Sequence, residues 1–179
     1  ILSVITNDID TLSQNLNING TANITGSWDI YIDSITFNSN ESSSTTSGTG
    51  EVDATDKTKA SYQANLLKPQ DVVVYDVVVA NNGTIDAVLN DITLTPEDNE
   101  YFKFETIGIE KGEELAAKTG NSATTKSFKI KITFKDSVTE ANMSASGTKV
   151  DGLVKLDYVQ EGVKFETEDV PGGDEIVVE

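Results

Sequence analysis

Residues 66–91, LLKPQDVVVYDVVVANNGTIDAVLND, contain the pattern that decides the fold. Two apolar segments, Val72–Ala80 and Thr84–Leu94, flank the sequence Asn81-Asn82-Gly83. An Asn-Gly pair between two β-prone segments is the strongest short-range signal for a β-hairpin. The stretch therefore predicts a hairpin at the centre of an all-β protein.

Alternation along the first strand of this hairpin predicts which of its faces is buried. Successive side chains of a strand point to opposite faces of the sheet. One face carries Val73, Tyr75, Val77 and Val79, whereas the other face includes the charged Asp76. We expect the uncharged face to lie in the core.

Similar short segments, separated by Gly, Asn, Asp and Pro, continue along the chain. They predict an antiparallel β-sandwich of the jelly-roll or immunoglobulin-like type, with an N-terminal extension strand. The expected strands are Ser27–Phe37, Glu51–Ala54, Ala60–Leu67, Tyr101–Ile109, Lys126–Phe134, Leu153–Gln160 and Val163–Thr167. The residues expected in the core are Val73, Val77, Phe128, Ile130, Ile132, Leu156 and Tyr158.

Four stretches depart from simple alternation. The apolar residues change parity at Ser34, which predicts a β-bulge or bend. The spacing of Ile9, Leu12 and Leu16 slightly favours a helical turn over an extended arm. The segment 110–118, EKGEELAAK, is the only expected helix, and the polar segment 38–50 is expected to be a mobile surface loop.

These patterns divide the chain into three parts. Residues 1–15 form an arm, residues 16–167 the sandwich, and residues 168–179 an acidic tail. A chain of 179 residues is long enough for one such domain with its own core.

Composition excludes several classes of partner and chemistry. The net charge of −17 arises from 30 acidic residues against 13 basic ones, which disfavours binding to nucleic acid or to an anionic membrane. The chain has no histidine and no cysteine, so it lacks the usual general base and the usual zinc ligands. We expect no enzymatic activity, no cofactor, no metal and no zinc dependence.

Carboxylate groups leave two alternatives open. The pairs Asp29/Asp33 and Glu113/Glu114 have the residue types of a glycosidase, but solvated acids are much the commoner explanation. The segments 97–100 and 8–10 carry oxygen donors suited to calcium, although neither has the spacing of an EF-hand loop.

Five sequons provide candidate N-glycosylation sites, and the one in the polar loop is expected to be the most accessible. They are Asn19, Asn23, Asn40, Asn82 and Asn142.

Three stretches resemble a known group of secreted proteins. They are INGTANITGSWDIYI at 18–32, KPQDVVVYDVVVANNGTIDAVLNDI at 68–92 and GLVKLDYVQ at 152–160. Together they are similar to the TasA/camelysin group of Firmicute biofilm-matrix proteins and to archaeal pilins with the same sandwich. The resemblance implies a jelly-roll-like fold, export by signal peptidase and assembly into extracellular fibres by donor-strand exchange. Camelysin is labelled a metalloprotease, but this chain has no histidine for zinc, so that activity is not carried over.

Two functions from different classes follow. In the first, the protein is a filament subunit at the cell surface, a pilus-like helical homopolymer. Its arm residues Ile1, Leu2, Val4 and Ile5 then complete a sheet of the neighbouring subunit. In the second, it is a monomeric adhesion or ligand-binding module, with ligand loops such as 38–50. The start at Ile1 is expected to reflect a mature product whose export signal has been removed.

Overall fold

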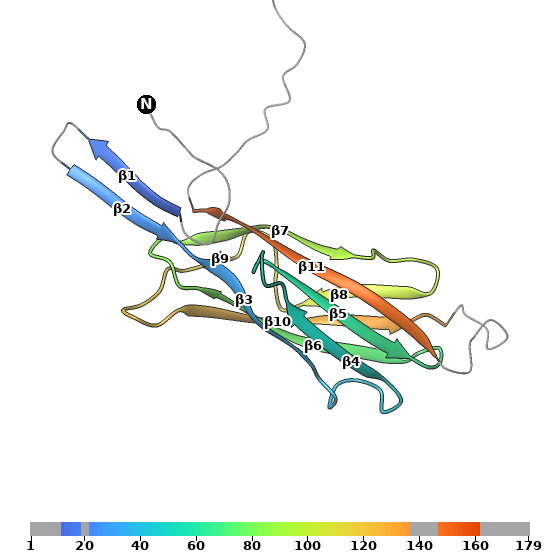
Figure 1. Cartoon of the computed structure of the whole chain (residues 1–179). Helices are drawn as coiled ribbons and strands as arrows, with labels where there is room; N and C mark the ends of the chain where they lie inside the picture. Colours follow the sequence, from blue (N-terminus) through green and yellow to red (C-terminus); the bar gives the residue numbers. More distant parts are fainter. Residues whose placement is uncertain (1–11, 19–21, 137–146, 162–179) are drawn as a thin grey trace, which may run out of the picture.

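The computed structural model describes residues 12–18, 22–136 and 147–161, with side chains described from residue 26 onward. This part of the chain contains strands and turns but no helix. Two antiparallel sheets pack face to face around one core, and a separate two-stranded hairpin extends from them (Figure 1). We call the two-sheet body the sandwich. The expected all-β, antiparallel architecture is confirmed.

The first sheet has four strands in the order β3-β6-β10-β8. Its strands are β3 (Ile30–Phe37), β6 (Val72–Asn81), β10 (Thr124–Phe134) and β8 (Phe102–Ile107). The pattern of β6 explains its central position, because Val73, Tyr75, Val77 and Val79 are fully buried on the face expected from the sequence.

The second sheet has five strands in the order β4-β5-β11-β7-β9. Its strands are β4 (Ser47–Val52), β5 (Lys59–Leu66), β11 (Thr148–Gln160), β7 (Ala87–Thr95) and β9 (Glu114–Leu115). Its inner face contributes Tyr62, Leu66, Leu89, Val154 and Leu156 to the core.

The core confirms most of the expected burial. Of the seven residues expected there, six are buried: Val73, Val77, Phe128, Ile130, Ile132 and Leu156. The seventh, Tyr158, is half-buried and packs against the edge of the core. It follows a register shift between Asp157 and Tyr158 near the end of β11, where the strand leaves the centre of the sandwich.

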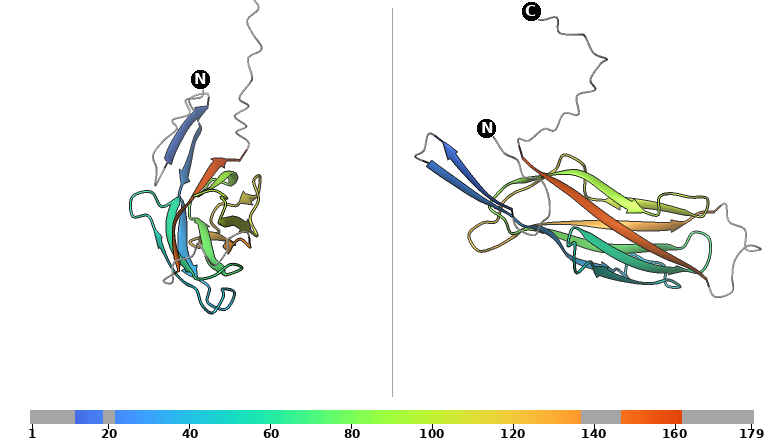
Figure 2. Two further views of the ribbon diagram at one scale, coloured as in Figure 1. Left: turned by 90° about the vertical axis from the view of Figure 1, so that its right-hand side faces the viewer. Right: turned by 45° about the horizontal axis from the view of Figure 1, so that its top comes forward.

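The hairpin consists of β1 (Leu12–Ile18) and β2 (Ala22–Trp28) and projects beyond one end of the sandwich (Figures 1 and 2). Only Asp29 separates β2 from β3, so the hairpin prolongs an edge strand of the first sheet. Leu12 pairs with Trp28, which places the start of β1 at the base of the hairpin. The expected helical turn around Leu12 and Leu16 is wrong, because these residues lie in a strand.

The predicted central hairpin is also wrong. The strands β6 and β7 that flank residues 81–83 belong to different sheets, so the chain crosses the sandwich between them. Asn81 is fully buried; its side chain accepts a hydrogen bond from the N–H of Gly83 and donates to the carbonyls of Ile85 and Leu115. Gly83 has no positive φ, and a side chain there would clash with the backbone at Ser27. The Asn-Gly sequence thus serves a close backbone approach and a buried amide rather than a hairpin turn.

The predicted helix at 110–118 is replaced by a turn and the short strand β9. Gly112 adopts a left-handed conformation with φ of 88°, which interrupts a helix after two residues. Its N–H donates to the carbonyl of Leu89, and Leu115 is buried opposite Ala87. A segment of nine residues is too short to keep a helix against this competing contact.

The structure confirms the bulge expected in β3 but only part of the loop expected after it. The register between β3 and β6 shifts between Ile32 and Ser34, which confirms the bulge. The segment 38–50 is more ordered than expected, because its last residues form β4. Residues 38–46 are tied to β6, because the hydroxyl groups of Ser43 and Ser42 accept hydrogen bonds from the N–H groups of Val72 and Val74, and the N–H of Ser43 donates to the carbonyl of Val72.

Candidate functional site

The arm residues Ile1, Leu2, Val4 and Ile5 lie outside the described residues, as do the expected strand 163–167 and the acidic tail. The site that such an arm would need is a sheet edge with no neighbouring strand. Such an edge would lie on one of the two lateral sides of the sandwich.

One lateral side of the sandwich is closed. There the edge strands β3 and β4, which belong to different sheets, pack directly against each other. Two glycines of β4 make this possible: a Cβ on Gly50 would lie 2.9 Å from side-chain carbons of Ile35, and one on Gly48 2.7 Å from a ring carbon of Phe37. Glycine is required here because the two strands approach so closely.

The opposite lateral side is open. The strand β9 pairs with β7 only at Ala87 and Val88, and no other described strand lies beside the rest of β7. Leu156, which pairs with Ile92, donates its N–H to Thr58, on the side away from β7. Because hydrogen-bonding direction alternates along an antiparallel ladder, the backbone groups of Ile92 and Leu94 point away from β11. No described strand covers the edge from Asp91 to Thr95, which we call the vacant edge; the Asp91 carboxylate accepts a hydrogen bond from the N–H of Ile92 and forms an ion pair of 2.5 Å with Lys111.

An open groove of about 480 Å³ runs along this vacant edge, between β7 and β8. Its apolar lining comes from Ile92 and Leu94 of β7 and Phe104 of β8. Ile92 and Leu94 are only half-buried, so extra apolar contact there would remove further surface from water. Three acids, Asp91, Glu97 and Asp98, complete the lining with Thr93 and Thr106.

The facing edge of β8 is partly blocked by side chains. Asp98 accepts a hydrogen bond of 2.7 Å from the N–H of Phe104, and Asn99 accepts one of 3.0 Å from the N–H of Phe102. Asp98 and Asn99, which the sequence marked as calcium donors, thus act as acceptors for an exposed strand edge. Such caps are a known protection against unwanted strand pairing.

The other candidate calcium segment, 8–10, lies outside the described residues. One member of each carboxylate pair suggested for glycosidase chemistry has a structural partner. Asp29 accepts a hydrogen bond from the side-chain amide of Asn82, and Glu113 forms an ion pair of 3.1 Å with Lys126.

The sequons differ in how they are placed. Asn40 is exposed on the turn after β3, as expected. Asn82 is half-buried, and its side-chain nitrogen is bonded to Asp29, so the group that would carry a sugar is already engaged. Asn23 lies in β2, whereas Asn19 and Asn142 lie outside the described residues.

A charged network holds the turn after β3 against the outer face of the first sheet. Lys129 of β10 forms ion pairs with Asp76 of β6 and with Glu41 of the turn. The amide of Asn38 donates to both of these carboxylates. The hydrogen bond to Asp76, and to a smaller extent the one to Glu41, raise the pKa of Lys129, so the lysine is held in its charged form. A charged, exposed lysine is a poor nucleophile, and the network is structural.

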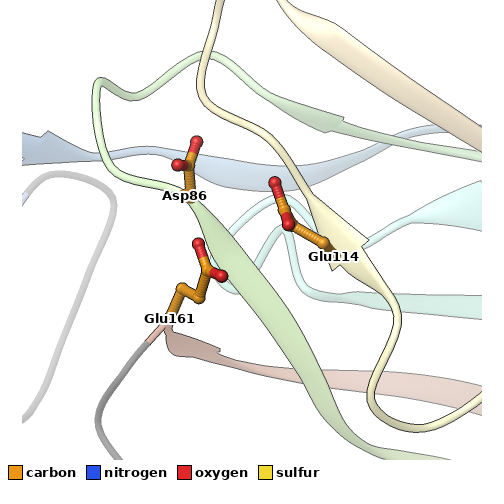
Figure 3. Close-up of side chains that lie close together, drawn as sticks. All are labelled: Asp86, Glu114 and Glu161. Carbon is orange, nitrogen blue, oxygen red and sulfur yellow. The ribbon is translucent and has the colours of Figure 1, made fainter.

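Three exposed carboxylates gather at the end of the second sheet: Asp86, Glu114 and Glu161 (Figure 3). Each offers an oxygen within 4.8 Å of the other two. Asp86 also accepts a hydrogen bond of 2.6 Å from the N–H of Ala117. Three carboxylates supply at most part of the six to eight oxygens that calcium takes. The sequence did not mark this group because its members lie on three separate strand ends.

No helix in the described part of the chain is long and apolar enough to span a membrane. Comparison with protein-family models, with curated proteins and with solved structures gave no match.

Proposed function

We propose that the protein is a structural subunit of an extracellular filament that polymerises by donor-strand exchange. In this proposal residues 1–5 of one subunit add a strand to the sandwich of the next. The sandwich would be of the jelly-roll or immunoglobulin-like type, as in the TasA/camelysin group that the sequence resembles.

The observation that carries the proposal is the difference between the two lateral sides of the sandwich. One side is closed by β3 packed on β4, whereas the other leaves the edge of β7 vacant above a partly apolar groove. An exposed strand edge is a template for pairing with another chain. Strand addition to such an edge is a common mode of recognition.

The energetics favour docking of this arm by a small margin. Burial of a large apolar side chain contributes about 1.5–3 kcal/mol, and the arm has four such side chains in five residues. Ordering the backbone costs about 1–2 kcal/mol per residue. Hydrogen bonds along a vacant edge shift this near balance towards docking.

The geometry of such a contact explains a filament rather than a closed dimer. The arm and the acceptor edge are different surfaces of the same chain, so each subunit donates to one neighbour and accepts from another. A head-to-tail contact of this kind produces an open polymer unless its rotation closes a ring.

Deletion of residues 1–5 tests the proposal. We expect the truncated chain to remain a folded, soluble sandwich that does not polymerise, because none of the core residues described above is removed. Negative-stain electron microscopy and size-exclusion chromatography of both chains provide the measurement. Replacement of Ser3 by alanine, which leaves the apolar residues in place, is the control and should polymerise. Normal filaments from the truncated chain would refute the donor-strand mechanism.

The groove also supports a second candidate, a monomeric surface module that binds an extended peptide. Asp91 is already paired with Lys111, and the other two acids of the groove, Glu97 and Asp98, would favour a basic ligand. A chain that stays monomeric with its arm intact, and binds basic peptides in a salt-dependent manner, would favour this function.

A further inference from the structure

We propose that Asn82 is a site of spontaneous covalent modification that the folded chain keeps blocked. In the sequence Asn82-Gly83 the asparagine side chain can form a cyclic imide with the next backbone nitrogen, because glycine places no side chain in the way. The fold holds both reacting groups in hydrogen bonds. Local opening of this segment releases them, and the product then prevents the segment from closing again. Neither step depends on assembly into filaments.

The reaction exchanges one C–N bond for another. The backbone nitrogen of Gly83 loses its proton to a base in the solvent and attacks Cγ of the Asn82 side chain. A bond forms between these two atoms, the bond from Cγ to Nδ2 breaks, and the Nδ2 group takes up a proton and leaves as ammonia. Water then opens the imide at one of its two carbonyl carbons, which gives aspartate or isoaspartate at residue 82.

The fold restrains the attacking nitrogen. The N–H of Gly83 donates a hydrogen bond of 2.9 Å to Oδ1 of Asn81. Asn81 is fully buried, and its Nδ2 group donates to the carbonyls of Ile85 and Leu115, so the acceptor is itself fixed in place. A proton held by a buried acceptor is harder to remove than one that faces water, because its loss also breaks the hydrogen bond.

The group that is attacked is restrained as well. Nδ2 of Asn82 donates a hydrogen bond of 2.9 Å to the carboxylate of Asp29, and the N–H of Asn82 donates one of 2.8 Å to the Asp29 carbonyl. The carbonyl of Gly83 accepts a hydrogen bond of 2.9 Å from the N–H of Lys118. The backbone on both sides of the reacting bond is therefore held, and rotation of Gly83 towards the Asn82 side chain would break these contacts.

The opening that frees Asn82 is the separation of residues 82–84 from residues 27–29, where β2 meets β3. Two further hydrogen bonds of 2.9 Å close this contact: the N–H of Thr84 donates to the Ser27 carbonyl, and the N–H of Ser27 donates to the Thr84 hydroxyl. Segments of a folded protein open locally at free energies below that of global unfolding. Where opening and closing are fast, the rate of modification follows the population of the open form.

The product does not fit the closed segment. A carboxylate in place of the amide removes the donor to Asp29 and places a second negative charge beside it. Two carboxylates at this distance repel each other. In isoaspartate the main chain also gains one carbon, which displaces the N–H of Gly83 from Asn81. A single opening can thus become permanent and leave the attachment of the hairpin β1–β2 loosened.

Peptide mapping by mass spectrometry of the full chain tests the block. The chain is kept at mildly alkaline pH, either folded or unfolded in guanidinium chloride, and conversion of Asn82 is followed with time. Asn19 is also followed by Gly and Thr, so it calibrates the rate in the unfolded chain. We expect similar rates for the two asparagines in denaturant, and a rate for Asn82 at least tenfold lower in the folded chain. Equal rates for Asn82 in both conditions would overturn the inference.

Two variants test whether these hydrogen bonds are the cause. Asn81→Ala removes the acceptor of the Gly83 N–H, and Asp29→Ala frees the Asn82 side chain. We expect each to raise the rate for Asn82 in the folded chain at least fivefold. Asp33→Ala, at an exposed position of β3, is the control and should leave the rate unchanged. If Asn81→Ala does not fold, Asp29→Ala decides, and a rate equal to that of the control would contradict the inference.

Asn82→Asp reproduces the product and tests the second step. We expect it to unfold at a lower urea concentration than the parent chain. The double variant of Asn82→Asp with Asp29→Asn exchanges donor and acceptor and should recover most of the loss, which a double-mutant cycle measures. An unchanged midpoint in Asn82→Asp, or a double variant that recovers nothing, would overturn the claim that the product keeps the segment open.

Discussion

At the residue scale, the hydroxyl groups of two buried tyrosines differ in their hydrogen bonding. The rings of Tyr62 and Tyr75 lie 5.4 Å apart in the core. The hydroxyl of Tyr75 donates a hydrogen bond of 2.5 Å to the carbonyl of Gln63. The hydroxyl of Tyr62 is buried without a hydrogen-bond partner in the described part of the chain.

This difference predicts opposite outcomes for two matched substitutions. Tyr75→Phe leaves the Gln63 carbonyl without its partner and should lower the free energy of unfolding by about 1–3 kcal/mol. Tyr62→Phe removes a hydroxyl that has no bond to lose, so its effect should be within about 0.5 kcal/mol of zero. Urea unfolding of both variants provides the measurement. An equal loss in the two variants would contradict the account of the core.

The buried tyrosines also predict alkaline unfolding. Burial raises the pKa of Tyr62 and Tyr75, and burial with the nearby charge of Glu113 raises the pKa of Tyr158 to about 12. A raised folded-state pKa gives a stabilisation that is complete below the unfolded value of 10 and is lost as the pH rises above it. Absorbance of tyrosinate and circular dichroism, followed together from pH 9 to 13, should change in one step for these residues. Full ionisation near pH 10 in a folded protein would contradict the described burial.

At the scale of the element, the closed side depends on the glycines of β4. A Cβ on Gly50 would meet the side chain of Ile35 at 2.9 Å and its carbonyl oxygen at 3.0 Å, so β4 would have to move. Gly50→Ala should therefore lower the free energy of unfolding by about 1–3 kcal/mol. Glu51→Ala, at an exposed neighbouring position, is the control and should have little effect. Thermal unfolding provides the measurement. An unchanged free energy of unfolding in Gly50→Ala would contradict the close packing of β3 on β4.

Individual strands could be predicted from the sequence because alternation is a local signal. In β10, Phe128, Ile130, Ile132 and Phe134 are buried as their spacing indicates. The bulge in β3 was predictable for the same reason. Strand pairing could not be predicted in the same way, because it depends on contacts between distant residues. The prediction of a hairpin at residues 81–83 was wrong because a buried side-chain amide and a close backbone contact take the place of the turn.

Of the candidate site, only the arm could be predicted from the sequence. Four large apolar side chains in residues 1–5 mark a segment suited to strand addition. The proposed acceptor edge could not be predicted, because it depends on how far β9 extends along β7. That strand was expected to be a helix, and the left-handed Gly112 that prevents this also ends the cover of β7 near Leu89.

At the scale of the whole molecule, the two ends of the sandwich differ from each other, and so do its two lateral sides. The hairpin β1–β2 prolongs one end, and the vacant edge lies on the side opposite to β3 (Figures 1 and 2). In the proposed assembly, an arm that docks at β7 of another copy would repeat the same relation from subunit to subunit. This arrangement predicts a one-start or multi-start helical filament rather than a closed dimer.

Binding of a peptide of residues 1–11 to the chain that lacks residues 1–5 tests this central claim most directly. Nuclear magnetic resonance of the labelled truncated chain reports both binding and its location. We predict saturable binding, with amide shifts concentrated at Asp91–Thr95 and at Phe102–Ile107. A peptide with Leu2→Asp and Val4→Asp, the control, should bind at least tenfold more weakly. An absence of binding at millimolar peptide, or shifts concentrated on β3 and β4, would contradict the account.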